Sequence, residues 1–263
     1  PYHNWIHAID VLQYSFYQIK KSKFENILTK LELLGIFIAS ISHDTNHDGF
    51  TNPYHQKAQT PIGILYKDLS INEMNHCAMT IDVFNQIETN IFHAIPDNDL
   101  KRIWSLIIQL ILSTDMGLHF KILKNANDIM DQGPVNLSNP KHRFMTMSLI
   151  LKIADISNAS RPFYIAENWC DVLDDEVWRQ HLVEKENGWI AGDNSDDRSM
   201  MKKAKNQVEF YTYVCLPLFT ALARILPELQ VNAEAVNDNL HIWKQRVEEL
   251  EQTLIDQDKM NIK

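Results

Sequence analysis

The stretch that decides the fold is residues 100–111, which read LKRIWSLIIQLI. Its apolar residues recur every three or four positions, as on one face of an α-helix; they are Leu100, Ile103, Trp104, Ile107, Ile108 and Ile111. The same spacing, often after a Ser, Asp or Asn suited to cap a first turn, predicts helices over most of the chain. They cover 4–20, 25–47, 72–88, 119–131, 141–157, 163–186, 204–225 and 233–258. We therefore expect an all-α fold.

The composition favours one compact domain. The chain has 263 residues, of which 45% are hydrophobic and 22% charged, and this excludes a disordered chain. Seven Gly and nine Pro are too few for the many turns of a β-sandwich. Because no repeat or linker divides the sequence, we expect residues 1–263 to form a single multi-helix domain. The start at Pro1, without Met, leads us to expect a fragment of a longer chain.

Charge and cysteine usage narrow the possible partners and compartment. A net charge of −9 disfavours nucleic-acid and anionic-membrane surfaces. The odd number of cysteines, all in apolar segments, indicates reduced thiols in a cytoplasmic protein; they are Cys77, Cys170 and Cys215. We see no apolar run near the roughly 18 residues of a membrane span and no signal peptide. We expect no membrane contact by this segment, although flanks outside it can anchor the whole protein.

Three further segments have more than one interpretation. The apolar residues of 233–258 alternate spacings of four and three, a heptad seam that can pack internally or pair with a second copy; they are Val236, Leu240, Trp243, Val247, Leu250 and Leu254. We prefer internal packing and leave a homodimer open. The stretches 48–61 and 187–198 contain Gly and Pro or acidic residues and are expected to be site-forming or mobile loops.

Histidines and aspartates suggest metal chemistry. His3 and His7 are four residues apart, as are His43 and His47, so on helices each pair would project from one face. Such a pair alone is also ordinary on a surface or in a core. His43 is followed directly by Asp44, and an adjacent His-Asp can bind one metal while the carboxylate bridges to a second.

A third acid is then expected, and Asp155 in the apolar run LILKIADISN (149–158) supplies it. A carboxylate in such a run is costly to bury alone. The alternative interpretation is an ion pair between Asp155 and a Lys or Arg.

Five blocks resemble, in order, the signatures of class I cyclic nucleotide phosphodiesterases: YHNWIHAIDV (2–11), HDTNHDGFTN (43–52), STDM (113–116), ADISN (154–158) and NQVEF (206–210). The resemblance extends from Tyr2 to about Leu226. It implies an HD-type helical phosphodiesterase domain. The implied reaction is hydrolysis of a 3′,5′-cyclic nucleotide to the 5′-nucleoside monophosphate, with the cyclic nucleotide as the partner.

The resemblance also implies a dinuclear metal site. Its Zn²⁺ ligands would be His7, His43, Asp44 and Asp155, with Asp44 bridging to Mg²⁺ or Mn²⁺ and a hydroxide between the metals attacking phosphorus. The residues matching those that orient metal-bound waters are His47, Glu73 and Thr114. Read singly, Glu73 is a solvated acid and Thr114 a helix cap.

His3 matches the general acid, oriented by Glu73 or another acid. Its alternative role is that of an exposed terminal residue.

For the purine base, the resemblance implies a glutamine contact at Gln207, a clamp between Phe210 and Leu173, and a further contact from Asn158. Without the metal motif, Gln207 and Phe210 would be surface and core residues. Residues 178–184 (WRQHLVE) and 194–198 (NSDDR) depart from the family pattern. The stretch 158–169 favours cGMP slightly over cAMP, and a glutamine amide can rotate to suit either.

Two other functions remain open. A different HD-type nucleotide phosphohydrolase would explain the metal ligands but not Gln207, Phe210 or the block at 2–11. A catalytically silent cyclic-nucleotide-binding domain would be expected to lack a ligand or the acid, and none is missing.

Overall fold

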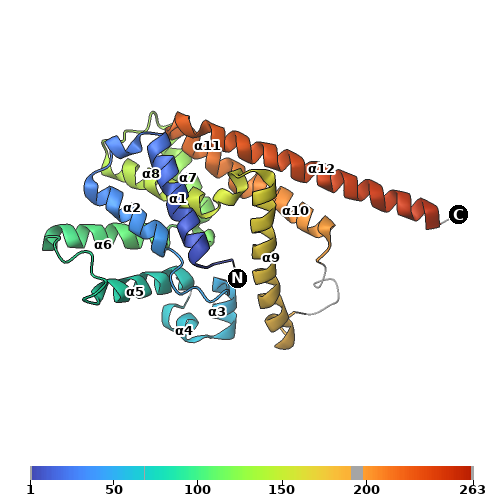
Figure 1. The fold of residues 1–263 in the computed structure, drawn as a ribbon, viewed down its shortest axis with the longest axis horizontal. Coiled ribbons are helices and arrows are strands. Elements are labelled where there is room, and N and C mark those ends of the chain that lie inside the picture. Colours follow the sequence, from blue (N-terminus) through green and yellow to red (C-terminus); the bar gives the residue numbers. More distant parts are fainter. Residues whose placement is uncertain (1, 68, 191–197, 262–263) are drawn as a thin grey trace.

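A computed structural model describes residues 2–67, 69–190 and 198–261, and every regular element among them is helical (Figure 1). The all-α prediction is confirmed. The α-helices are α1 (Trp5–Lys21), α2 (Lys30–Ser42), α3 (Asn52–Ala58), α4 (Pro61–Tyr66), α5 (Ile71–Asn85), α6 (Asp97–Leu112), α7 (His119–Asp131), α8 (Pro140–Asp155), α9 (Phe163–Glu186), α10 (Met200–Phe210), α11 (Leu216–Ile225) and α12 (Gln230–Asn261). A short 3₁₀ turn, η3 (Ser157–Ser160), follows α8, and a π-helical turn, η5 (Tyr211–Cys215), joins α10 to α11.

The largest difference from the predicted helices lies at α2. The sequence predicts a helix over 25–47, but α2 begins after Thr29, whose side chain forms a reciprocal capping box with Glu32. It ends at Ser42, and Asn46 beyond it adopts a left-handed conformation with φ 65°. Local capping therefore shortens the helix at both ends.

One short helix, α3, lies within the predicted loop at 48–61, and a second, α4, begins at its end, where the sequence predicts no helix. Thr51 caps α3 and Thr60 caps α4, and each helix has a proline in its first turn. This combination of cap and proline is a common helix start that apolar periodicity does not detect. In the second predicted loop, 187–198, residues 191–197 lie outside the described residues.

Helix α8 forms the centre of the core. Ten consecutive residues from Met145 to Ala154 are buried, so the helix is enclosed on all sides. Helices α1, α2, α6 and α11 contact it. Because α8 ends at Asp155, its last residue emerges from the core close to the start of α1 and the end of α2.

Helix α12 divides into two parts. Val236, Leu240 and Trp243 are buried in the core, which agrees with internal packing of the seam. Further along, Leu254 is 52% exposed, and the C-terminal part of α12 extends beyond the body of the molecule (Figure 1). Pairing with a second copy stays a prediction.

One described helix, the continuous run Met200–Ile225, is long and apolar enough to span a membrane. The bent pair formed by α6 and Met116–Asp131 passes the same test only when both parts are joined. This differs from the expectation that no apolar run approaches the length of a membrane span. Within Met200–Ile225, Leu218, Phe219 and Leu222 are at most 2% exposed, and α11 packs on α12 and α8. Core helices meet this length and hydropathy test too.

Candidate metal centre and active site

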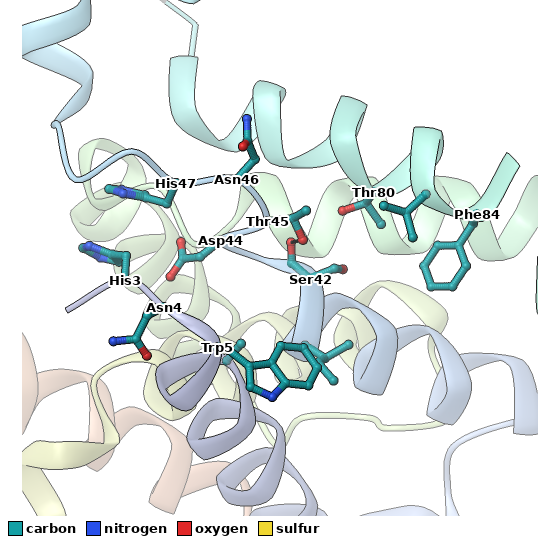
Figure 2. Close-up of a pocket in the computed structure, with 13 residues that line it drawn as sticks. His3, Asn4, Trp5, Ser42, Asp44, Thr45, Asn46, His47, Thr80 and Phe84 are labelled. Atoms are coloured by element: carbon teal, nitrogen blue, oxygen red, sulfur yellow. Dashed lines mark hydrogen bonds between the residues drawn. The ribbon is translucent and has the colours of Figure 1, made fainter. Parts of the chain in front are cut away.

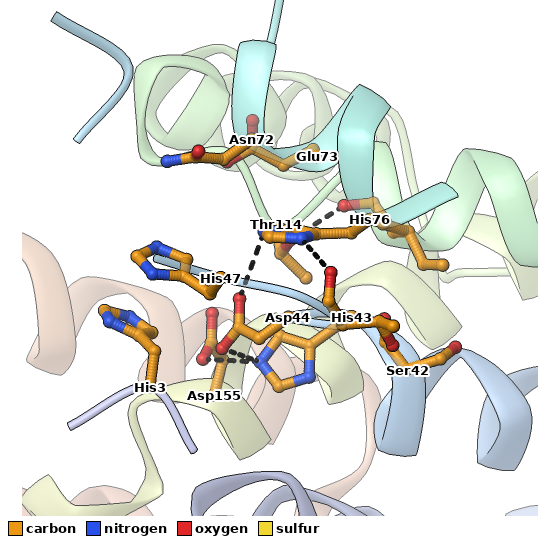
Figure 3. A network of polar contacts seen from close by, with 12 residues as sticks. His3, Ser42, His43, Asp44, His47, Asn72, Glu73, His76, Thr114 and Asp155 are labelled. Carbon is orange, nitrogen blue, oxygen red and sulfur yellow. Dashed lines mark hydrogen bonds and ion pairs between the residues drawn. The ribbon is translucent and has the colours of Figure 1, made fainter. Parts of the chain in front are cut away.

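Four side chains from three parts of the fold converge at the end of α8, and Figure 3 shows three of them, His43, Asp44 and Asp155. They are His7 on α1, His43 and Asp44 directly after α2, and Asp155 at the end of α8. The distance from Asp155 Oδ1 is 3.1 Å to both His7 Nε2 and His43 Nε2. Asp44 Oδ2 lies 2.9 Å from His43 Nε2 and 3.3 Å from His7 Nε2.

These distances fit a metal site. Two ligand atoms that each lie about 2.1 Å from one zinc ion are roughly 3.0 to 3.4 Å apart. Asp44 Oδ2 is buried and accepts no hydrogen bond of acceptable geometry, which is unusual for a carboxylate oxygen unless a cation satisfies it. The group His7, His43, Asp44 and Asp155 can therefore hold a metal ion.

Hydrogen bonds to the backbone fix which nitrogen faces the cluster. His43 Nδ1 donates to the Ser40 carbonyl at 2.9 Å, so its Nε2 faces the two carboxylates. His76 Nδ1 donates to the Thr45 carbonyl at 2.8 Å, and its Nε2 lies 3.7 Å from Asp44 Oδ1. Such bonds commonly orient metal-binding imidazoles.

The electrostatics show what a cation would have to displace. Burial lowers the pKa of His43, but the charges of Asp44 and Asp155 outweigh burial and raise it well above its ordinary value. Burial opposes the shift at His7 too, and the hydrogen bond to Asp155 together with the nearby carboxylate of Asp44 raises its pKa. The pKa values of Asp44 and Asp155 are lowered despite burial, chiefly by the charge of His43. A divalent cation would therefore compete with two imidazole protons.

A second group lies beside the first and contains His3, His47 and Glu176. His3 Nδ1 pairs with Glu176 Oε1, and Glu176 Oε2 accepts the His3 backbone N–H at 3.2 Å. The imidazole of His3 stacks on that of His47 with ring centroids 3.9 Å apart. The side chain of Glu176 is 5% exposed. The acid that contacts His3 is thus Glu176 on α9.

His47 is neutral, and its proton lies on Nε2. Burial and the nearby charge of His3 lower its pKa to about 4. Its Nδ1 accepts the Gly49 N–H at 2.9 Å, so the proton resides on Nε2. A protonated Nε2 is a hydrogen-bond donor and no metal ligand.

The prediction that each histidine pair shares one helix face is wrong. α1 begins at Trp5 with Asn4 as its N-cap, so His3 precedes the helix that carries His7. α2 ends at Ser42, so neither His43 nor His47 belongs to it. The tight turn through Asn46 nevertheless returns His47 to the cluster.

Glu73 and Thr114 lie near Asp44, as Figure 3 shows. Glu73 accepts a hydrogen bond from Asn52 at 3.0 Å, and burial raises its pKa to about 7. Thr114 Oγ1 donates to the Ile111 carbonyl at 2.7 Å, which is the helix-capping contact. Both line a cavity of about 570 Å³ together with Asp44, His47 and Asp155.

A second cavity, of about 560 Å³, adjoins the first at His3, Asp44 and His47 (Figure 2). Away from these residues its wall is largely apolar, with Trp5 and Phe84 among the lining side chains. The two histidines and the aspartate therefore separate two cavities of similar volume.

The residues predicted to bind the base come from three elements. Asn158 is in η3, Leu173 on α9, and Gln207 and Phe210 on α10. Neither of the two cavities beside the metal cluster is lined by any of them. Their joint role as a base pocket stays a prediction.

One residue from each segment that departs from the family pattern, Gln180 and Arg198, connects α9 to a neighbouring element. Gln180 accepts the Thr51 N–H at 2.9 Å and so connects α9 to α3. Arg198 pairs with Asp174 and Asp175, which joins the start of the α10 segment to α9.

Sequence reasoning missed Glu176 as a functional candidate. It follows Asp174 and Asp175 in an acidic run, which is typical of a solvated helix face. The available signal was its position on the apolar side of the predicted helix, three residues after Leu173.

Comparison with known proteins gives consistent matches. A family profile described as "3'5'-cyclic nucleotide phosphodiesterase" matches residues 2–236. The high affinity cGMP-specific 3',5'-cyclic phosphodiesterase 9A of Pan troglodytes is 31% identical over 230 residues, which are 88% of this chain and 38% of the relative. The 3',5'-cyclic-nucleotide phosphodiesterase regA of Dictyostelium discoideum is 29% identical over 94% of this chain and 31% of its own.

Solved structures agree with these matches. The phosphodiesterase domain of Salpingoeca rosetta rhodopsin phosphodiesterase superposes with a TM-score of 0.91 at 27% identity, over 96% of this chain and 77% of that one. The two curated relatives are longer proteins, and the chain spans about a third of their length.

Proposed function

Because the chain belongs to the 3',5'-cyclic nucleotide phosphodiesterase family, we propose that it hydrolyses the cyclic phosphate of cGMP or cAMP to the 5′-nucleoside monophosphate. The observation that carries the proposal is the convergence of His7, His43, Asp44 and Asp155 beside a histidine that a buried glutamate holds. A preference for cGMP is supported by the relative from Pan troglodytes, which is named as cGMP-specific.

The donor set suits a dinuclear metal site. Two imidazoles and two carboxylates match the ligands that Zn²⁺ accepts, and Asp44 has a second oxygen for a neighbouring Mg²⁺ or Mn²⁺. When bound, these ions supply an acidified water and neutralise charge on the phosphoryl oxygens. The chain contributes an oriented ligand set, because a backbone carbonyl fixes His43, and His76, fixed by another carbonyl, lies beside the ligand Asp44.

His3 is assigned to proton donation, and His47 to a hydrogen bond with water or substrate. Water attacks phosphorus, the bond from phosphorus to the 3′ oxygen breaks, and that oxygen needs a proton because an alkoxide is a poor leaving group. His3, with Nδ1 held by Glu176, keeps Nε2 to donate this proton. His47, with its proton on Nε2, donates a hydrogen bond to a water or a phosphoryl oxygen. Glu73 and Thr114 complete the polar wall of the same cavity.

Base recognition is assigned to Gln207, with Phe210 and Leu173 as the apolar clamp and Asn158 as a further contact. The support is chemical: an amide both donates and accepts, and an aromatic face stacks on a purine.

The test is product analysis with purified protein. We expect cGMP and cAMP to yield the 5′-monophosphate in a reaction that chelation abolishes and added Zn²⁺ with Mg²⁺ restores. A different HD-type phosphohydrolase would leave both cyclic nucleotides intact while cleaving nucleoside mono- or triphosphates. A silent domain would bind a cyclic nucleotide without releasing product, and either result would overturn the proposal.

A further inference from the structure

The turn η3 links two functional regions of the chain. Asp155 of the metal cluster is the last residue of α8, and Asn158, the candidate base contact, is three residues further along in η3. A 3₁₀ turn this short leaves its last carbonyls without partners inside the turn. The position of Asn158 therefore depends on groups that hold η3 from outside.

One side of η3 is held by α1. Arg161, the residue after the turn, donates to Asp10 at 2.7 Å, and Ser157 also contacts Asp10, at 3.4 Å. Tyr14 and Ser160 share a hydrogen bond of 2.6 Å between their hydroxyls. Helix α1 thus fixes three side chains of this segment.

Helix α12 also holds η3, and the amide of Asn239 makes two hydrogen bonds to this segment. Asn239 is 4% exposed, and its Nδ2 donates to the Ala159 carbonyl at 2.9 Å and to the Arg161 carbonyl at 2.8 Å. These two bonds use both N–H groups of the amide. Trp243, one helical turn further along α12, is fully buried against Phe163 and fixes the register of the helix.

We propose that Asn239 is a positioning residue for cyclic nucleotide binding: its amide caps the C-terminal end of η3 and so sets where Asn158 meets the base. Asn239 lies three residues beyond the region that the family profile matches. The inference rests on the proposed function. Because both hydrogen bonds of the Asn239 amide go to Ala159 and Arg161, and Asp155 belongs to the buried helix α8, loss of the cap moves the base contact more than the metal ligand.

The test compares two leucine substitutions in the same helix. Asn239→Leu removes both donors with little change in volume. Asn232→Leu is the matched control, because Asn232 is also buried in α12 and accepts a hydrogen bond from Tyr17, whereas its own Nδ2 donates to no carbonyl of η3. We expect Asn239→Leu to raise KM for the cyclic nucleotide about tenfold with kcat changed less than about threefold, and Asn232→Leu to leave both within about twofold.

A readout that needs no activity comes from amide hydrogen exchange. Inside η3 the Ala159 N–H bonds the Ile156 carbonyl, and the Arg161 N–H bonds the Asn158 carbonyl. We expect residues 157–161 to exchange faster in Asn239→Leu than in wild type or Asn232→Leu. If Asn239→Leu does not fold, Asn239→Asp, which keeps the shape but cannot donate at neutral pH, takes its place in both measurements.

The outcomes separate the two proposals. Unchanged KM and unchanged exchange at 157–161 in the Asn239 variant overturn the positioning role, as does an equal effect of Asn232→Leu. Absence of cyclic nucleotide hydrolysis by wild type overturns the proposed function instead. In that case, slower or unchanged exchange of residues 157–161 in Asn239→Leu still decides against the cap.

Discussion

Single residues in this site are defined by where their hydrogen bonds place protons. His43 donates from Nδ1 to a carbonyl and turns Nε2 to the two carboxylates, whereas His47 accepts at Nδ1 and carries its proton on Nε2. Two histidines four residues apart in sequence thus have opposite chemistry. The backbone contacts, more than the side-chain type, distinguish a ligand from a donor.

The contact between Glu176 and His3 leads to a prediction about proton donation. Glu176→Gln keeps the shape but removes the charge that orients and stabilises a protonated His3. We expect kcat to fall about a hundredfold while KM and metal content stay near wild type. Steady-state kinetics with metal analysis measures this. Glu186→Gln, an exposed residue of α9, is the control, and an unchanged kcat for Glu176→Gln would remove Glu176 from the mechanism.

Glu73 leads to a prediction about pH. Burial raises its pKa from 4.5 to about 7, so between these values the folded chain holds a proton that the unfolded chain has lost. Stability therefore falls as pH rises through this window. In chelated protein, Glu73→Gln removes this loss, and its stability relative to wild type should increase by about 3 kcal/mol between pH 4.5 and pH 7.

Denaturant unfolding across this range checks the effect of Glu73. The exposed Glu88→Gln serves as the control. Parallel pH profiles for Glu73→Gln and wild type would contradict the raised pKa.

At the scale of elements, the close packing of α3 on α4 depends on one glycine. A Cβ at Gly63 would lie 2.2 Å from the backbone oxygen of His55, and a backbone atom cannot move aside as a side chain can. Gly63→Ala should therefore destabilise the fold by about 2 kcal/mol. Ile64→Ala, at the neighbouring and 63% exposed position, should stay within about 0.5 kcal/mol. Chemical denaturation compares them, and equal stabilities would show that α4 tolerates the displacement.

The long amphipathic helices were predictable from the sequence, whereas the short helices and several helix ends were not. Apolar periodicity predicts α9 at its observed bounds because the amphipathic pattern runs through its whole length. It overextends α2 and misses α3 and α4, since capping by Thr29, Thr51 and Thr60 is a local side-chain effect. The error at α2 also produced the wrong shared helix face for His43 and His47.

At the scale of the whole molecule, the site is an assembly of distant segments. The family resemblance predicted the residues that meet at the cluster, because its motifs include His7, the pair His43 and Asp44, and Asp155. The pairing of His3 with Glu176 spans 173 residues and depends on how α9 docks beside the start of α1, which no local pattern contains. The same holds for Asn239, whose partners are about 80 residues earlier.

The most direct test of a metal-dependent cyclic nucleotide phosphodiesterase is a metal titration. Protein depleted by chelation is titrated with Zn²⁺ in excess Mg²⁺, and bound zinc and cGMP hydrolysis are measured together. We predict that activity returns in proportion to bound zinc in wild type and in Asp128→Ala, an exposed control. Asp155→Ala should bind little zinc and remain at least about a thousandfold slower. Full activity of the depleted protein, or of Asp155→Ala, would contradict the metal site.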